Sequence, residues 1–324
     1  MHALITGGAG FIGSHLAEEL LTSGNQVTVV DNLSTGNLTN IQHLQGRTNF
    51  DVVVADILNE TVMDRLVSEC DIVYHLAAAV GVELIVTKPV EVIQTNILGT
   101  EMVLKLVARY LKKVVITSTS EIYGKSDKTP FSENDDRVLG PTTKNRWSYS
   151  SSKAIDEFLA LAYNKEKNIE TIVVRLFNTV GPRQTGQYGM VVPRFVSQAL
   201  NGDPITVYGS GKQVRCFAYV SDIVGALVEL SQNEKAVGQI FNVGNDNPIS
   251  ILELAEKVKK ATNSDSEIKF VSYDEAYEEG FEDMSIRVPD LTKIKNLIGY
   301  VPKVHIDEIL KNVIEYFASA NMKE

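Results

Sequence analysis

Short apolar runs alternate with amphipathic stretches through the first half of the chain. Runs of this kind bounded by turn residues predict strands, and apolar positions three and four residues apart predict helices. Helices are predicted at Thr61–Ser68 and Val90–Tyr110. Strands are predicted at 4–6, 26–30, 50–54, 72–76 and 171–176, and from residue 114 onward. This alternation predicts an α/β fold whose strands form a parallel, doubly wound sheet.

The pattern changes after Leu176. Residues 177–183 are rich in turn formers, and shorter elements with interspersed charged and aromatic residues follow. Strands are predicted there at 205–208 and 240–243, and helices at 191–200, 220–232, 291–298 and 306–318, with one more capped at Ser250. We therefore predict a first domain over 1–177 and a smaller α/β part for the substrate over 178–324, with segments near 220–250 returning to the main sheet.

A glycine-rich turn joins the first predicted strand to the first helix. Gly7, Gly10 and Gly13 occur in the order strand, turn, helix that gives this spacing its meaning. Gly7 permits a tight turn, Gly10 lets backbone approach a pyrophosphate, and Gly13 lets helix and strand pack closely. The amide groups at the helix N-terminus attract the pyrophosphate. The first domain is thus predicted to be a dinucleotide-binding Rossmann domain.

Asp31 ends the second predicted strand, where a carboxylate can accept hydrogen bonds from both ribose hydroxyls of a dinucleotide. Its charge would repel an additional phosphate on that ribose, so NAD is favoured over NADP. Further cofactor contacts are predicted near the ends of the strands, at the start of the helix after the glycine turn and on the helix Val90–Tyr110. These are Phe11, Ile12, Asn32, Asp56, Ile57, Leu76, Ala77, Ala78 and Asn96.

Tyr149 and Lys153 lie four residues apart in a predicted helix that opens at Tyr149. That spacing places both side chains on one helix face about one turn apart. An ammonium beside a phenol favours the phenolate, so we predict a lowered pKa for Tyr149. A tyrosine of this kind takes a proton from a sugar hydroxyl while a nicotinamide accepts the hydride. Thr119, at the end of the strand from Val114, is predicted to share that proton.

The composition limits the other functions. The formal net charge of −10 and the lack of clustered Lys and Arg argue against a nucleic-acid surface. Cys70 and Cys216 lie in apolar runs, which predicts reduced, buried thiols. We also expect no metal site, because no clustered ligand spacing stands out, and no membrane span. A cytoplasmic protein is the expectation.

These residues together resemble the extended short-chain dehydrogenases/reductases that modify nucleotide sugars. The likeness covers almost the whole chain. It rests on Gly7, Gly10, Gly13, Asp31, Thr119, Tyr149, Lys153, Asn178, Arg215, Cys216, Phe217 and Asp222. The resemblance implies a tightly held NAD that oxidises the sugar at C4, a nucleotide-sugar substrate, and a homodimer formed through the helices near 90–110 and 148–165.

The two residues after Thr119 separate the members of this family. Hexose 4-epimerases carry uncharged residues there, and 4,6-dehydratases carry Asp-Glu, because loss of water needs an acid. Ser120-Glu121 resembles the pair in UDP-glucuronate decarboxylases. The stretches 146–149 and 211–217 resemble the decarboxylase domain that makes a 4-keto-pentose for lipid A modification. UDP-glucuronate decarboxylase is therefore the first hypothesis, and a UDP-glucose or UDP-glucuronate 4-epimerase remains open. A 4,6-dehydratase and a non-catalytic NAD-sensing scaffold are less favoured.

The resemblance also implies roles for residues outside the cofactor site. Thr119, Glu121, Tyr149, Lys153 and Arg287 are the expected catalytic residues, with Glu121 and Arg287 positioning or protonating the uronate. The expected substrate-binding residues are Ser120, Asn178, Arg183, Tyr208, Arg215 and Arg287. Arg215 is expected to hold the diphosphate and Tyr208 to stack on a uracil. The acidic run 274–283 is read as a solvated face, with the edge of a lid as the alternative.

Overall fold

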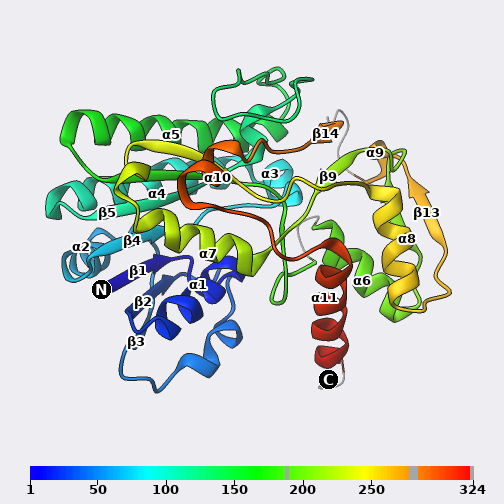
Figure 1. The fold of residues 1–324 in the computed structure, drawn as a ribbon, viewed down its shortest axis with the longest axis horizontal. Helices are drawn as coiled ribbons and strands as arrows, with labels where there is room; N and C mark the ends of the chain where they lie inside the picture. The colour runs from blue at the N-terminus through cyan, green and yellow to red at the C-terminus, as the bar shows by residue number, and fades with distance from the viewer. Residues whose placement is uncertain (187–189, 277–283, 322–324) are drawn as a thin grey trace.

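In the part of the chain that the structure describes, residues 1–186, 190–276 and 284–321, seven parallel strands form the central sheet of this computed structural model (Figure 1). Their order is β11-β6-β5-β4-β1-β2-β3, and each neighbouring pair is parallel. The chain runs outward from β1 in one direction to β3 and in the other to β11. A reversal of this kind opens a crevice at the carboxyl ends of the strands. The predicted doubly wound α/β fold is confirmed.

The strands of the central sheet match the predicted apolar runs closely. Their bounds are β1 His2–Thr6, β2 Gln26–Asp31, β3 Phe50–Val54, β4 Ile72–His75, β5 Lys113–Thr119, β6 Thr171–Leu176 and β11 Gln239–Val243. The last strand pairs with β6, so the segment after position 220 returns to the first sheet. The return is made by α7 (Val220–Ser231), whose buried face packs against α1 (Phe11–Thr22).

Alternating side chains of each strand supply two separate cores. Ile5 packs with α1 and α7 on one face of the sheet, and its neighbour Leu4 packs on the other face. That second face is covered by α2 (Glu60–Glu69), α4 (Pro89–Tyr110) and α5 (Arg146–Lys167). Because strand side chains alternate, burial on both faces requires the continuous apolar runs seen in the sequence.

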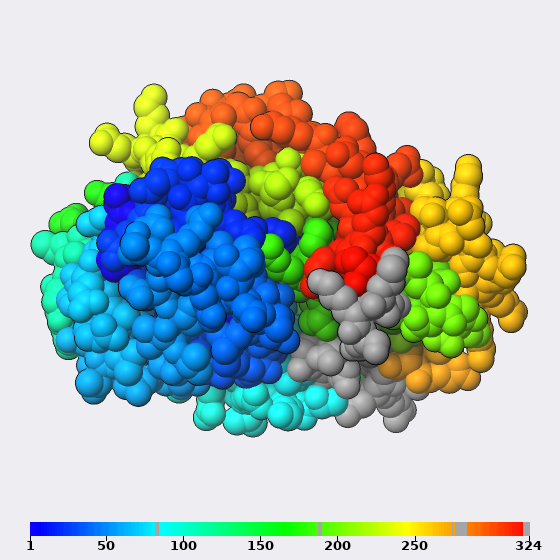
Figure 2. Space-filling view, turned by 90° about the horizontal axis from the view of Figure 1, so that it is seen from below, coloured from blue at the N-terminus to red at the C-terminus, as the bar shows by residue number. Residues whose placement is uncertain are grey.

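The second part of the molecule lies beside the carboxyl ends of these strands, to the right in Figure 1. Its core is formed mainly by α6 (Val191–Asn201), α8 (Ile251–Ala261) and α11 (Ile306–Asn321). Figure 2 shows the first part and the second part side by side, with α11 between them. The remaining elements are β7 Thr179–Val180, β8 Ile205–Tyr208, β9 Val214–Cys216, β10 Ala218–Tyr219, β12 Pro248–Ser250, β13 Ile268–Val271, β14 Ile286–Arg287, α3 Val82–Thr87, α9 Tyr273–Ala276 and α10 Thr292–Ile298.

Two predictions about local structure have clear outcomes. The helix predicted to open at Tyr149 begins earlier, at Arg146, so the predicted start is wrong by almost one turn. The buried Arg146 side chain ties this extra turn to the wall of the cleft, which sequence periodicity does not reveal. Cys70 and Cys216 are buried free thiols, as predicted, and burial raises the pKa of each to about 12.

Candidate active site

A cleft of about 490 Å³ runs along the carboxyl ends of the central strands and reaches the second part. Its volume lies in the range of small-molecule sites. Most of the predicted cofactor, catalytic and substrate residues line it. They are Gly7, Gly10, Phe11, Ile12, Gly13, Asp31, Asn32, Ile57, Leu76, Ala77, Ala78, Thr119, Ser120, Glu121, Tyr149, Lys153, Asn178, Tyr208, Arg215 and Arg287.

The glycine turn forms the floor of this cleft at the start of α1. Gly7 has a φ of +70°, and a Cβ there would lie 2.8 Å from the Ala77 amide nitrogen. A Cβ at Gly13 would lie 2.3 Å from the Gly7 carbonyl oxygen. At Gly10, the N-cap of α1, no side chain accepts a hydrogen bond from the first amide groups of the helix. Backbone without side chains at a helix N-terminus fits the pyrophosphate of a dinucleotide.

Asp31 is the last residue of β2 and lies beside the same turn. Its carboxylate accepts hydrogen bonds from the Ala9 amide at 2.9 Å and the Leu33 amide at 2.8 Å. Burial raises the pKa of Asp31, although these amide hydrogen bonds oppose the rise. The carboxylate is therefore fixed in the cleft wall where the predicted ribose contact requires it. Together with the glycine turn, it makes the chain's own residues fit NAD.

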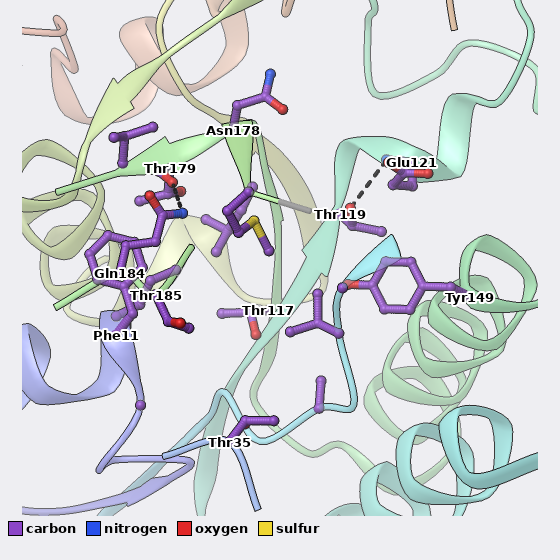
Figure 3. A pocket seen from close by; sticks show the side chains of 18 of the residues that line it. Phe11, Thr35, Thr117, Thr119, Glu121, Tyr149, Asn178, Thr179, Gln184 and Thr185 are labelled. Carbon is purple, nitrogen blue, oxygen red and sulfur yellow. Dashed lines mark hydrogen bonds between the residues drawn. The ribbon is translucent and has the colours of Figure 1, made fainter. Parts of the chain in front are cut away.

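Tyr149 and Thr119 face each other across the cleft from α5 and the end of β5 (Figure 3). The Thr119 hydroxyl is hydrogen-bonded to the Tyr149 phenol. Thr119 also accepts a hydrogen bond of 3.2 Å from the Glu121 amide, which starts the short helical turn 120–123. The threonine is thus held by backbone while it contacts the tyrosine. The predicted pairing of Thr119 with Tyr149 is present.

The predicted lowering of the Tyr149 pKa is wrong, because the chain's own groups raise it. Burial raises the pKa of Tyr149 above its ordinary value, and the negative charge of Glu121 adds to the rise. The Thr119 hydrogen bond and Arg287 act in the opposite direction but are weaker. The sequence reveals the spacing from Tyr149 to Lys153, but it reveals neither the burial of the phenol nor the nearby carboxylate.

Lys153 has a different partner from the one its spacing suggests. Its ammonium donates a hydrogen bond of 2.7 Å to the Asp156 carboxylate, one turn further along α5. The side chains are 3% and 0% exposed. Lys153 still lines the cleft together with Tyr149. The helix therefore presents a cation at the cleft that is paired with a carboxylate behind it.

Glu121 lies between two buried arginines in the same wall. Arg287 on β14 donates a hydrogen bond of 2.8 Å to the Glu121 carboxylate, and Arg146 on α5 donates one of 3.3 Å. Arg287 also reaches the Ser120 hydroxyl and the Asn178 side-chain oxygen, each at 3.5 Å. Carboxylate and guanidinium groups are thus concentrated within the cleft beside Tyr149. Such a wall is suited to hold an anionic group of a substrate.

The second part of the molecule forms another wall of the cleft. Arg215 on β9 lies level with Arg287 on β14 in the parallel pairing of these strands. The Arg194 guanidinium lies 3.8 Å from the centre of the Tyr208 ring, so one face of that ring carries a cation. Asn178 is fixed by a hydrogen bond of 3.0 Å from its amide to the Cys216 carbonyl.

Three predicted binding residues do not line this cleft. The Asp56 carboxylate accepts hydrogen bonds from Asn32 at 2.9 Å and from the Leu58 amide. Asn96 is buried and accepts a hydrogen bond of 2.8 Å from the Ala79 amide, so it supports the loop that follows β4. Arg183 donates a hydrogen bond of 2.6 Å to Glu18 on α1. Asp56 and Asn96 can affect the cleft only by fixing the segments to which they are hydrogen-bonded.

Sequence reasoning assigned no role to Arg146, which lines the cleft, or to Asp156, which lies behind it. Arg146 precedes Tyr149 by three positions, and this helical spacing is the signal that could have pointed to it. Asp156 follows Lys153 by three positions in the same way. The predicted acidic run 274–283 falls mostly outside the described residues.

Comparison with known proteins places this geometry in a family. The family described as GDP-mannose 4,6 dehydratase matches residues 4–313. The chain belongs to this family. Its predicted membership of the extended short-chain dehydrogenases/reductases that modify nucleotide sugars is thereby confirmed, since the relatives of this family include decarboxylases and epimerases of UDP-sugars.

Relatives of the family are similar over nearly the whole chain. UDP-N-acetyl-alpha-D-glucosaminuronate decarboxylase of Bacillus cytotoxicus is 44% identical and covers 97% of both chains. UDP-glucuronic acid decarboxylase 1 of Xenopus tropicalis is 40% identical over 97% of this chain and 71% of its own. The structure of UDP-glucuronic acid 4-epimerase from Bacillus cereus, in complex with UDP-glucuronic acid and NAD, is 29% identical, with a TM-score of 0.89 over 99% of this chain and 100% of its own. The predictions of an NAD-dependent nucleotide-sugar enzyme are confirmed at the level of the family.

The described residues contain neither a metal-binding cluster nor a membrane-spanning helix. Within 1–186, 190–276 and 284–321, His, Cys, Asp and Glu side chains nowhere gather in threes in a way that could hold a metal ion. No helix in these ranges combines the length and the apolar character needed to cross a membrane.

Proposed function

We propose that this protein removes carbon dioxide from a UDP-linked uronic acid through a 4-keto intermediate. The observation that carries the proposal is the meeting of Arg146, Arg287 and Glu121 in the cleft beside Tyr149. Two buried guanidinium groups concentrate positive charge where a substrate carboxylate can lie near the catalytic tyrosine. The likeness to decarboxylases at 44% and 40% identity supports the same reaction.

The residues around Tyr149 serve the first step. NAD, when bound, supplies the oxidant for carbon C4 of the sugar. Tyr149 takes the proton of the C4 hydroxyl, and the Thr119 hydroxyl stabilises the phenolate by its hydrogen bond. Lys153 lies on the same face of α5 and favours the phenolate by its charge. Gly7, Gly10, Gly13 and Asp31 hold the dinucleotide.

The wall of arginines serves the second step. Oxidation at C4 turns the uronate into a β-keto acid, whose C5–C6 bond breaks readily. Carbon dioxide leaves, the electron pair moves toward the C4 carbonyl, and a proton is added at C5. Arg287, with Glu121 and Ser120 beside it, positions the carboxylate so that this bond is aligned with the carbonyl. No acid for a leaving hydroxyl is needed, in agreement with Ser120 at the position where dehydratases carry Asp.

Product analysis tests this proposal. Purified protein is incubated with NAD and either UDP-glucuronate or UDP-N-acetylglucosaminuronate, and the products are identified by proton NMR. We expect a UDP-pentose or UDP-4-keto-pentose from at least one of them. Tyr149→Phe serves as the control and is expected to lose about 100-fold or more of the rate. A UDP-hexuronate epimer as the main product would contradict the proposal.

A 4-epimerase of UDP-uronates is the second candidate. It is favoured by the likeness to the UDP-glucuronic acid 4-epimerase of Bacillus cereus. Its first step requires the same Tyr149, Thr119 and Lys153. The charged Glu121 beside Arg287 argues against it, because a keto sugar that only turns over and is reduced again needs no ionised group there.

We also propose that the protein forms a homodimer through α4 and α5. Apolar side chains are exposed on both helices, with Phe158 at 68% and Ile155 at 42% on α5 and Val90 at 66% on α4. Exposed apolar groups that gather on neighbouring helices favour association. Phe158→Glu is expected to give a monomer in light scattering after gel filtration. Phe270→Glu, at a 53% exposed position on β13, is the matched control and is expected to leave the dimer intact.

Three further assignments complete the proposal. Residues 1–177 hold the cofactor, and 178–324 hold most of the nucleotide sugar. Arg215 and Asn178 bind the diphosphate, and the ring face of Tyr208 away from Arg194 stacks on the base. The cytoplasmic location stays a prediction, with which the two buried free cysteines agree.

A further inference from the structure

The face of α5 that carries the reaction residues continues beyond Lys153. Tyr149, Lys153 and Asp156 are separated by four and then three positions, so they form one stripe along the helix. Lys153 is the middle member of this stripe. All three side chains are buried. The Lys153 ammonium donates its hydrogen bond of 2.7 Å away from Tyr149, to Asp156.

Asp156 lies behind the cleft and does not line it. Its side chain is 0% exposed. Burial raises the pKa of Asp156, the Lys153 charge and Thr100 on α4 lower it, and Glu157 adds negative charge from the next position of α5. His75 at the end of β4 hydrogen-bonds to the same Thr100 at 3.1 Å, and burial lowers the pKa of His75 to about 3, so the imidazole is neutral. Lys153 is the cation that faces the Asp156 carboxylate.

The neighbouring carboxylate on the helix has a separate partner. Glu157 forms two hydrogen bonds with Arg175 on β6, at 2.9 and 2.7 Å. Adjacent carboxylates of α5 therefore belong to different ion pairs, of which one includes a residue of the cleft and the other does not. Glu157 is accordingly a matched control for Asp156, similarly buried and carrying the same charge.

We propose that Asp156 is a positioning residue of the active site, which holds the Lys153 ammonium by a hydrogen bond and so fixes its position beside Tyr149 in the cleft. This role rests on the proposed function only in requiring oxidation of the sugar at C4. An ammonium on a four-carbon stem has many rotamers, and a fixed acceptor reduces them. The arrangement Asp156, Lys153, Tyr149 resembles in its logic other catalytic groups that are oriented by a carboxylate behind them.

Charge alone does not explain a carboxylate at this place. The negative charge of Asp156 acts with that of Glu121 to raise the pKa of Tyr149, while Arg287 and the Thr119 hydroxyl lower it. Asp156 therefore makes the phenol a poorer acid. A buried carboxylate is also costly by itself. Its benefit to the reaction must accordingly come from the geometry that it gives to Lys153.

The test compares Asp156→Asn with Glu157→Gln in the full-length holoenzyme. Asparagine keeps the size but replaces the charged acceptor of Lys153 by a neutral amide, which holds an ammonium more weakly. We expect kcat of Asp156→Asn to fall between about 10- and 100-fold, with KM for the nucleotide sugar unchanged within about twofold. The acidic limb of its pH profile is expected to move to lower pH by on the order of one unit, because the opposing charge is gone. Glu157→Gln is expected to lower the stability to urea but to keep the wild-type pH profile.

A second measurement does not depend on turnover. The ultraviolet difference spectrum between each variant and its Tyr149→Phe counterpart reports ionisation of the Tyr149 phenol alone. We expect this ionisation at lower pH in Asp156→Asn than in wild type and at the wild-type pH in Glu157→Gln. If Asp156→Asn does not fold, Asp156→Glu replaces it, since it keeps the charge but displaces the carboxylate. That variant is expected to lose kcat with its acidic limb unmoved.

The results separate this inference from the proposed function. The kinetics are run on whichever UDP-sugar the wild-type protein turns over, by decarboxylation or by epimerisation, because both reactions begin at C4. An epimer as the wild-type product would overturn the proposed function and leave this test in place. A wild-type kcat and pH profile for Asp156→Asn, or equal shifts for Asp156→Asn and Glu157→Gln, would overturn the role of Asp156. For the replacement Asp156→Glu, a wild-type kcat would do the same.

Discussion

The Arg287 guanidinium donates a hydrogen bond of 2.8 Å to the Glu121 carboxylate across the wall of the cleft. The two residues are far apart in the sequence and come from different parts of the molecule, β14 and the turn after β5. The hydrogen bond between Arg287 and Glu121 places a cation from the second part of the molecule next to the reaction residues of the first part. Recognition of the sugar carboxylate and its oxidation can therefore take place in one cleft.

The first prediction concerns the charge of the substrate. Arg287→Met removes a buried guanidinium that faces the proposed carboxylate position. A hydrogen bond between charged groups contributes about 1.5–3 kcal/mol, so affinity for UDP-glucuronate should fall about 10- to 150-fold. Affinity for the neutral UDP-glucose should fall much less. Isothermal titration with both nucleotides checks this, and an equal loss for the two sugars would show that Arg287 does not read the carboxylate.

The second prediction concerns the cofactor. Asp31→Ala removes the carboxylate that the Ala9 and Leu33 amides hold in the cleft. We expect affinity for NAD to fall about 10- to 100-fold and the preference for NAD over NADP to diminish. Asp51→Asn is the matched control, since Asp51 is exposed on β3 and does not line the cleft, and should bind NAD within about twofold of wild type. Unchanged NAD binding by Asp31→Ala would refute the assigned ribose contact.

The third prediction concerns stability in acid. His75 is buried between Thr6 and Thr100, and its pKa is lowered from 6.5 to about 3, chiefly by burial. The unfolded chain binds this proton more readily, so the stabilisation is complete above pH 6.5 and is lost as the pH falls toward 3. The loss is on the order of 3–5 kcal/mol. Urea unfolding of His75→Gln at pH 7 and pH 4.5 should show a smaller difference than wild type.

A histidine on the surface provides the control for this prediction. His305→Gln replaces an exposed imidazole and should keep the wild-type difference between the two pH values. If His75→Gln also kept that difference, the burial of a neutral His75 would not contribute to acid stability.

The fourth prediction concerns the ion pair between Arg175 on β6 and Glu157 on α5. Arg175 forms two hydrogen bonds with Glu157 and a third, of 2.9 Å, with the buried Tyr123 hydroxyl. Arg175→Leu leaves the Glu157 carboxylate buried without its cation, which should lower the free energy of unfolding by about 3–5 kcal/mol. Lys311→Ala breaks an exposed pair with Glu315 and should cost less than about 1 kcal/mol. Similar losses for the two variants in urea unfolding would contradict this account.

The sequence predicted the strands because burial in a parallel sheet leaves short apolar runs. The predicted bounds match the structure at Phe50–Val54 and Thr171–Leu176. The sequence also located the glycine turn, Asp31, Thr119 and Tyr149, because each of these depends on local spacing. These residues all line the cleft.

Contacts between distant segments were beyond the reach of sequence periodicity. The partners of Glu121 come from α5 and β14, and only the fold brings them together. The same limit applies to Tyr149, whose pKa is raised by burial and by Glu121 although the local spacing predicts the reverse. The pairing of Arg183 with Glu18 on α1 is a further contact of this kind.

Loss of the C6 carbon tests the central claim most directly. UDP-glucuronate and UDP-N-acetylglucosaminuronate carrying ¹³C at C6 are each incubated with the purified protein and NAD, and labelled carbon dioxide is measured over time. The account predicts that at least one substrate loses its label as gas, that a UDP-pentose or UDP-4-keto-pentose forms in equal amount, and that Tyr149→Phe releases none at a comparable rate. Retention of the label in a UDP-hexuronate, while the sugar is turned over, would contradict it.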